Sequence, residues 1–192
     1  VVVVVIVGAG LGWMLLFRHP NTLPSGQTPA IGLPIYDFSH NSMIGGYGNI
    51  RWDASNTTVF HNGIDFSFNA SVTLAAPYNA YVDDIKFWFN DKGGHWQTNV
   101  ALWLNQQWTI EMIFESWALN ETYGYMQLAA LSVVSGQYVA ANQTIGNLLF
   151  HGSGCHLHFG VKSNGVTICP YDVFSESAKQ IFATQFFKVN AT

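Results

Sequence analysis

Short segments in which apolar and polar residues alternate fill most of this 192-residue chain between Tyr36 and about Pro170. Successive side chains of a β-strand point to opposite faces, so this alternation indicates strands that bury one face. Turn sequences rich in Gly, Asn and Asp, such as 90–94 and 162–165, separate the segments. The predicted strands are 71–75, 80–89, 99–104, 108–115, 123–128 and 156–162. The sequence therefore predicts a mainly β, antiparallel fold, followed by one short helix at 175–187 that Ser175 or Ser177 can cap.

Charged residues are scarce in this chain. They make up 9% of it, against about 25% in ordinary soluble domains. The formal net charge is only -4, whereas nucleic-acid binders carry clustered Lys and Arg. Hydrophobic residues make up 49%, which is too many for an intrinsically disordered chain. The composition therefore argues against a nucleic-acid partner and against disorder.

The first 17 residues form an uninterrupted apolar run that ends at Arg18. A helix of this length is just long enough to cross a hydrocarbon core. We interpret residues 1–18 as a single-pass membrane anchor; a signal-peptide remnant and, less well, a buried strand are the alternatives. Residues 19–34 contain four prolines and are predicted to form an extended linker. Residues 35–192 are then the folded domain.

Several features predict that this domain lies on the extracellular side of the cell membrane. The chain contains five Asn-X-Ser/Thr glycosylation sequons, which are typical of exported proteins. The two cysteines, Cys155 and Cys169, form a disulfide in such a compartment, or are two buried free thiols. The sequons begin at Asn56, Asn69, Asn120, Asn142 and Asn190.

Two histidine motifs are candidates for a metal site. In a strand, His61 and Asp65 project from the same face, and so do His156 and His158. A helix would also align His61 with Asp65, but it would not align the other pair. Two neighbouring strands can thus bring two imidazoles and a carboxylate together, which is the ligand set of a catalytic zinc ion. One histidine then remains for proton transfer.

The sequence around these motifs resembles the lysostaphin-like (LytM-type) zinc peptidases over roughly residues 45–174. The segment HNGIDFS at 61–67 is similar to the His-X-Gly-X-Asp motif of that family, and GSGCHLHFGV at 152–161 is similar to its His-Leu-His motif. Further similar segments occur in the family's order. These are GGYGNIR at 45–51, VTLAAPYNAYV at 72–82, SGQYVAANQTIG at 135–146 and ICPY at 168–171.

The resemblance implies a fold, a site and an activity. The fold is a compact antiparallel β-sheet, also called the duplicated hybrid motif. The zinc (Zn2+) ligands carried over are His61, Asp65 and His158, and His156 takes a catalytic position. The implied activity is hydrolysis of peptide bonds in a cell wall or similar surface polymer. Zinc would polarise the scissile carbonyl and activate water, and His156 would stabilise the oxyanion or move the proton.

One position departs from the family pattern. The family has a second catalytic histidine in a Tyr-X-His-Leu segment, and residues 125–128 (YMQL) place Gln127 there. Glutamine donates a hydrogen bond but does not titrate near neutral pH. The alternative function is therefore a catalytically impaired domain that serves as a binding or structural subunit of a cell-surface assembly. His95 and His151 are interpreted as loop residues.

Overall fold

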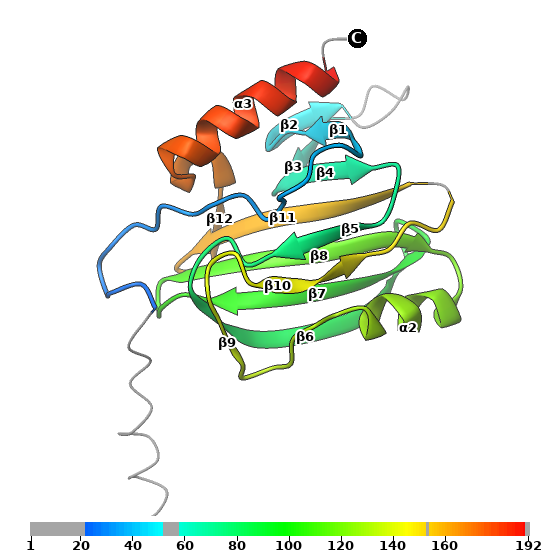
Figure 1. Cartoon of the computed structure of the whole chain (residues 1–192), viewed down its shortest axis with the longest axis horizontal. Coiled ribbons are helices and arrows are strands. Elements are labelled where there is room, and N and C mark those ends of the chain that lie inside the picture. Colours follow the sequence, from blue (N-terminus) through cyan, green and yellow to red (C-terminus); the bar gives the residue numbers. More distant parts are fainter. Residues whose placement is uncertain (1–21, 52–57, 153, 191–192) are drawn as a thin grey trace, which may run out of the picture.

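The structure, a computed structural model, describes residues 22–51, 58–152 and 154–190 (Figure 1). Most of its strands join one antiparallel sheet in the order β1-β4-β11-β8-β7-β6-β9, with β12 paired to β11; β5 with β10 and β2 with β3 form two small sheets. The strands are β1 (Asn41–Gly45), β2 (Gly48–Arg51), β3 (Thr58–His61), β4 (Ile64–Phe68), β5 (Val72–Ala75), β6 (Ala80–Asn90), β7 (His95–Trp103), β8 (Trp108–Ala118), β9 (Tyr138–Val139), β10 (Thr144–Leu148), β11 (Cys155–Ser163) and β12 (Val166–Ile168). The helices are α2 (Glu121–Ala129), the short 3-10 helix η1 (Pro170–Val173) and α3 (Glu176–Asn190). The prediction of a mainly β, antiparallel fold is confirmed.

The core lies on one face of the large sheet. Across three neighbouring strands, Leu157 of β11 pairs with Phe66 of β4 and with Phe114 of β8. All three side chains have an exposed fraction of 0%. Because side chains alternate along a strand, the residues between them project from the opposite face of the sheet. That opposite face carries the histidine motifs.

Helix α3 packs against β1 at one edge of the sheet (Figure 1). The ring of Phe182 lies 6.1 Å from that of Phe66 in the core. At the end of the helix, the Asn190 side chain donates from Nδ2 to the Ile44 carbonyl (2.9 Å) and accepts at Oδ1 from the Ile44 amide (3.3 Å). The helix predicted at 175–187 is confirmed, and Ser175 Oγ accepts from the Ala178 amide at its first turn.

One predicted strand is wrong. Residues 123–128 form helix α2, because Asn120 caps its start by accepting from the Tyr123 amide at 2.9 Å. Gly124 lies against Trp96 of β7, where an added Cβ would approach the Trp96 Cβ to 2.8 Å. A glycine lets the helix lie close to the sheet.

The predicted linker needs correction in its described part. Leu23, Ile31 and Leu33 are buried in the core. The Ile31 amide donates to the Val173 carbonyl at 2.9 Å, so this segment is bonded to η1. Residues 22–34 therefore belong to the folded domain and are not an extended linker.

The predicted membrane anchor at 1–18 lies outside the described residues. Among the residues that the structure describes, no helix has the length and apolar character needed to cross a membrane. Of the five sequons, Asn56 also lies outside the described residues, and the other four asparagines are exposed: Asn69, Asn120, Asn142 and Asn190. Glycosylation stays a prediction.

The predicted disulfide does not form. Cys155 and Cys169 are both free thiols. Cys155 begins β11, whereas Cys169 follows β12, whose Ile168 pairs with Val161 six residues further along β11. At about 3.3 Å per residue the two cysteines are roughly 20 Å apart, and a disulfide needs Cα atoms within about 7 Å. Burial raises the pKa of the Cys155 thiol to about 12, so this thiol is unreactive.

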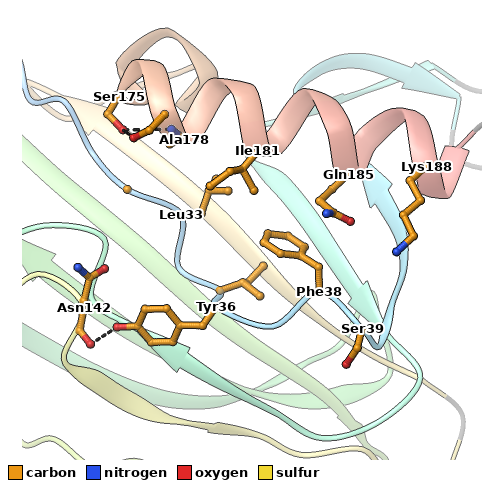
Figure 2. Close-up of a pocket in the computed structure, with 13 residues that line it drawn as sticks. Leu33, Tyr36, Phe38, Ser39, Asn142, Ser175, Ala178, Ile181, Gln185 and Lys188 are labelled. Atoms are coloured by element: carbon orange, nitrogen blue, oxygen red, sulfur yellow. Dashed lines mark hydrogen bonds between the residues drawn. The ribbon is translucent and has the colours of Figure 1, made fainter.

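A pocket of about 580 Å³ lies between α3 and residues 32–39 (Figure 2). Leu33, Phe38 and Ile181 form its apolar part, and Lys188 stands at one end. The Tyr36 hydroxyl donates to the Asn142 carbonyl beside it. The pocket shares no lining residue with the histidine motifs.

Candidate metal centre

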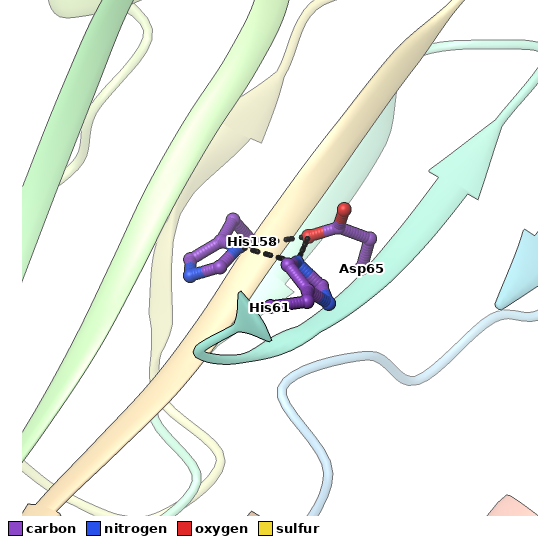
Figure 3. A group of neighbouring side chains, drawn as sticks. All are labelled: His61, Asp65 and His158. Carbon is purple, nitrogen blue, oxygen red and sulfur yellow. Dashed lines mark hydrogen bonds and ion pairs between the residues drawn. The ribbon is translucent and has the colours of Figure 1, made fainter. Parts of the chain in front are cut away.

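Three elements bring His61, Asp65 and His158 together (Figure 3). His61 ends β3, and a turn at Asn62 and Gly63 leads directly into β4, which carries Asp65. In the antiparallel pairing of β4 with β11, Asp65 lies opposite His158. The two motifs, far apart in the sequence, thus meet through strand register, but His61 and Asp65 lie on two strands joined by a turn and not on one face of a single strand, which corrects the prediction from their spacing.

The donor atoms of the three residues lie within reach of one ion. His158 Nδ1 is 2.9 Å from Asp65 Oδ1, and His61 Nε2 is 3.1 Å from His158 Nδ1 and 3.2 Å from Asp65 Oδ1. Zinc holds such ligands at about 2.0–2.2 Å, which separates neighbouring ligand atoms of a tetrahedron by about 3.3–3.6 Å. A shift of a few tenths of an ångström would therefore admit the ion. Imidazole and carboxylate donors suit zinc, so the residues fit the metal that the sequence predicted.

The surroundings orient these ligands and keep them nearly dry. His61 is 8% and Asp65 5% exposed. The Nδ1 atom of His61 lies 2.7 Å from the Gly46 carbonyl, so it donates its proton there and leaves the Nε2 lone pair for a metal. Burial alone would raise the pKa of Asp65, but hydrogen bonds with His158 and His61 outweigh it and hold that pKa well below its usual range. Asp65 is thus an anionic ligand.

Gly63 makes room for the ring of His158. A Cβ at this position would lie 2.6 Å from His158 Nε2 and 2.8 Å from the Phe159 carbonyl oxygen. We expect Gly63→Ala to push the ring out of place and to weaken zinc binding by about 10- to 100-fold, the usual effect of losing support around a ligand. Competition titration with a chromophoric zinc chelator measures the affinity.

The matched control for this substitution is Gly26→Ala, because Gly26 lies in an exposed turn away from the site. Because Gly26 has a positive φ of 77°, alanine at this position introduces backbone strain. It makes no contact with a metal ligand. Equal zinc affinity in Gly63→Ala and the wild type would contradict the role of this glycine.

A pocket of about 290 Å³ opens beside the three ligands. His156 lines it, with Nε2 lying 3.9 Å from Asp65 Oδ2. The pocket also contains residues that the sequence analysis did not assign to a site. These are Asn90, Lys92, Gly93, His95, Glu115 and Trp117.

Glu115 and His95 are the main additions to the site. Glu115 lies opposite His156 in the pairing of β8 with β11, and its Oε2 is 3.3 Å from His156 Nε2 and 2.8 Å from His95 Nε2. Burial would raise the pKa of Glu115, but hydrogen bonds with His156 and His95 outweigh it and lower the pKa to about 2. Burial would lower the pKa of His95, but the bond to Glu115 raises it overall. The two residues form a buried ion pair, so the interpretation of His95 as a loop histidine is wrong.

Trp117 forms a wall of the same pocket. Its φ of 53° is unusual for a large residue and re-aims the side chain near the end of β8. The indole ring lies 4.5 Å from the ring of His95 and 6.0 Å from that of His156. It also lines a second pocket, of about 360 Å³, which His156 and Asp65 line as well. Trp117 therefore stands between two open spaces at the candidate site.

Gln127 is not part of this site, which corrects the sequence interpretation. It lies in α2 with an exposed fraction of 1%. Its Nε2 donates to the Asn147 carbonyl and its Oε1 accepts from the Leu149 amide, each at 2.9 Å. These bonds tie α2 to the segment around the end of β10. The residue that faces His156 in the described structure is Glu115, which the order of motifs alone did not identify.

The arrangement has the fold of the lysostaphin-like peptidases, as the motif resemblance predicted. No protein-family model and no curated protein sequence matches the chain. Solved structures do match it. A zinc-containing peptidase from Vibrio cholerae superposes with a TM-score of 0.53 at 17% identity, over 74% of this chain and 39% of that one.

Two further structures match to the same degree. A chain of the SpoIIQ–SpoIIIAH pore-forming complex has a TM-score of 0.53 at 17% identity, over 81% of this chain and 97% of that one. Csd3 from Helicobacter pylori has a TM-score of 0.53 at 16% identity, over 85% of this chain and 42% of that one. The chain thus spans well under half of the Vibrio and Helicobacter proteins. At these identities the likeness shows the fold alone.

Proposed function

We propose that this chain is a zinc-dependent peptidase that hydrolyses peptide bonds in a cell-wall-like or other surface polymer. The observation that carries the proposal is the mutual approach of His61 Nε2, Asp65 Oδ1 and His158 Nδ1 to 2.9–3.2 Å beside an open pocket. Three protein ligands with room for a fourth are typical of catalytic zinc sites, whereas structural zinc sites usually have four protein ligands. The fold shared with a zinc-containing peptidase supports the same reaction class.

The chain's own residues supply the other parts of the reaction. When bound, zinc would supply the Lewis acid that polarises the scissile carbonyl and activates water. His156 lies next to Asp65 and lines the pocket, so its imidazole can stabilise the developing oxyanion or move a proton to the leaving amine. The wall formed by Trp117 excludes water from one side of the pocket.

The cellular setting is part of the proposal. The apolar run at 1–17 and the sequons at exposed Asn69, Asn120 and Asn142 support a membrane-anchored domain on the extracellular side. A surface with few charges agrees with shielding by glycans or by neighbouring proteins.

Metal content and hydrolysis, measured on the same purified chain, test the function. We expect one zinc ion per chain and release of new amino groups from purified peptidoglycan, or from synthetic peptides with the sequences of its cross-bridges and stem. The variant His158→Ala is expected to lose the zinc and all hydrolysis, because two remaining ligands do not hold the ion. The matched control is His40→Ala, since His40 is exposed and lies outside the pocket. A wild-type chain that neither binds zinc nor differs from His158→Ala would overturn the proposal.

A second candidate is a subunit of a surface assembly without effective catalysis. Its support is the match to a chain of a pore-forming complex, which this fold spans almost completely. The same experiment separates the two candidates, because stoichiometric zinc without hydrolysis of any of these substrates favours the subunit.

A further inference from the structure

The pocket next to the metal ligands contains an acidic residue with two histidine partners. Glu115 Oε2 receives both contacts, 2.8 Å from His95 Nε2 and 3.3 Å from His156 Nε2. Glu115 is 9% and His95 2% exposed. Burying a carboxylate costs free energy unless hydrogen bonds or charges replace its lost hydration. The two histidine contacts supply this compensation.

The orientation of the His95 ring is set by contacts other than the one with Glu115. Its Nδ1 lies 3.0 Å from the Gly93 carbonyl, which can only accept, so Nδ1 donates there and Nε2 points to Glu115. Gly93 has no Cβ, and a Cβ would lie 2.5 Å from the His95 ring. The ring of Trp117 packs against that of His95, with 4.5 Å between the ring centroids. The carboxylate of Glu115 therefore has one defined position.

Two contacts mark the orientation of His156. Its Nε2 lies 3.3 Å from Glu115 Oε2 and 3.9 Å from Asp65 Oδ2. The torsion that rotates an imidazole ring has broad wells about half a turn apart, so packing alone selects its orientation poorly. An acceptor on one side selects the ring orientation and the tautomer whose proton faces it.

We propose that Glu115, held by His95, is a positioning residue that fixes the imidazole of His156 beside the metal ligands. This inference rests on the proposed function, since His156 is the group that would touch the substrate. A chain of contacts begins at the Gly93 carbonyl, passes through His95 and Glu115, and ends at the imidazole of His156. It gives β8 a role in the reaction although this strand carries no metal ligand.

The test compares three variants of the full chain. Glu115→Ala removes the acceptor, and we expect kcat to fall by about 100-fold or more, the usual contribution of a well-placed acid or base. KM and zinc content are expected to stay unchanged, because no metal ligand is altered. Glu115→Gln keeps an acceptor oxygen and should retain more activity than Glu115→Ala. The matched control is Glu111→Ala on the same strand, where Glu111 bonds to Lys162 and lies outside the pocket.

A second measurement does not depend on turnover. Long-range proton–nitrogen NMR of the histidine rings is expected to show His156 as one species protonated at Nε2 in the wild type. In Glu115→Ala the tautomers of His156 should mix, and in Glu111→Ala they should not. If the wild type binds zinc but hydrolyses nothing, the proposed function fails, and the NMR comparison alone decides the positioning role. An unchanged His156 signal in Glu115→Ala, or a kcat loss explained entirely by lost zinc, would overturn it. If Glu115→Ala does not fold, Glu115→Asp takes its place, because the shorter side chain withdraws the acceptor from His156; a wild-type kcat together with a wild-type His156 signal in Glu115→Asp would do the same.

Discussion

Saturating zinc is expected to stabilise the wild-type chain against unfolding, and Asp65→Ala is expected to abolish that effect. A ligand that binds only the folded state adds about 2.7 kcal/mol at a concentration 100 times its Kd. Asp65 Oδ1 contacts both histidine ligands, so its loss removes one donor and the only negative charge of the three. Denaturant unfolding with zinc and with a chelator, for each variant, measures the difference.

The zinc-dependent difference is the informative quantity in this experiment. Asp65 is buried beside two histidines, so Asp65→Ala changes the stability of the metal-free chain as well. Asp83→Ala is the matched control, because Asp83 is exposed on β6 and outside the metal pocket. A full zinc-induced gain in Asp65→Ala would show that the ion binds somewhere else.

Phe66→Ala is expected to destabilise the fold by about 3–5 kcal/mol, the usual cost of deleting a large buried aromatic ring. Phe66 has an exposed fraction of 0% and lies next to Asp65 in β4. Its ring lies 6.5 Å from that of Phe38 and 6.1 Å from that of Phe182 of α3. The cavity would therefore loosen the helix from the sheet as well as the strand that carries Asp65.

Chemical denaturation monitored by circular dichroism measures this loss. The control is Phe60→Ala, because Phe60 is 55% exposed and lies next to His61. A surface substitution of that kind usually changes stability by less than about 0.5 kcal/mol. Similar losses in the two variants would mean that the core does not lie on the face we describe.

The elements that could be predicted from the sequence are those with local signals. Alternation predicted five of the strands, β5, β6, β7, β8 and β11, and a serine before an apolar pattern predicted α3. The spacing of His156 and His158 predicted that they share a face of one strand, whereas His61 and Asp65 lie on two strands joined by a turn. Family resemblance then joined the two motifs into one site, which β4–β11 register confirms as a cluster.

What could not be predicted depends on register between distant strands. Glu115 becomes part of the site only because β8 pairs with β11 so that residue 115 faces His156. Two glutamates in one strand of a charge-poor chain, Glu111 and Glu115, were the available signal. The predicted disulfide was wrong because Cys155 and Cys169 are close in the sequence but are separated in space by most of the length of β11. Helix α2 was missed because its cap, Asn120, was interpreted only as a sequon.

The contact of Asn190 with Ile44 has a consequence for how the domain behaves among its neighbours. β1 is the outer strand of the described sheet, and an open strand edge can recruit strands from other molecules. The Asn190 amide satisfies both the donor and the acceptor of Ile44, as another strand would. The end of α3 thus covers the edge of β1 at Ile44, and a sugar attached to the Asn190 nitrogen would replace one of the two hydrogens of the group that donates there.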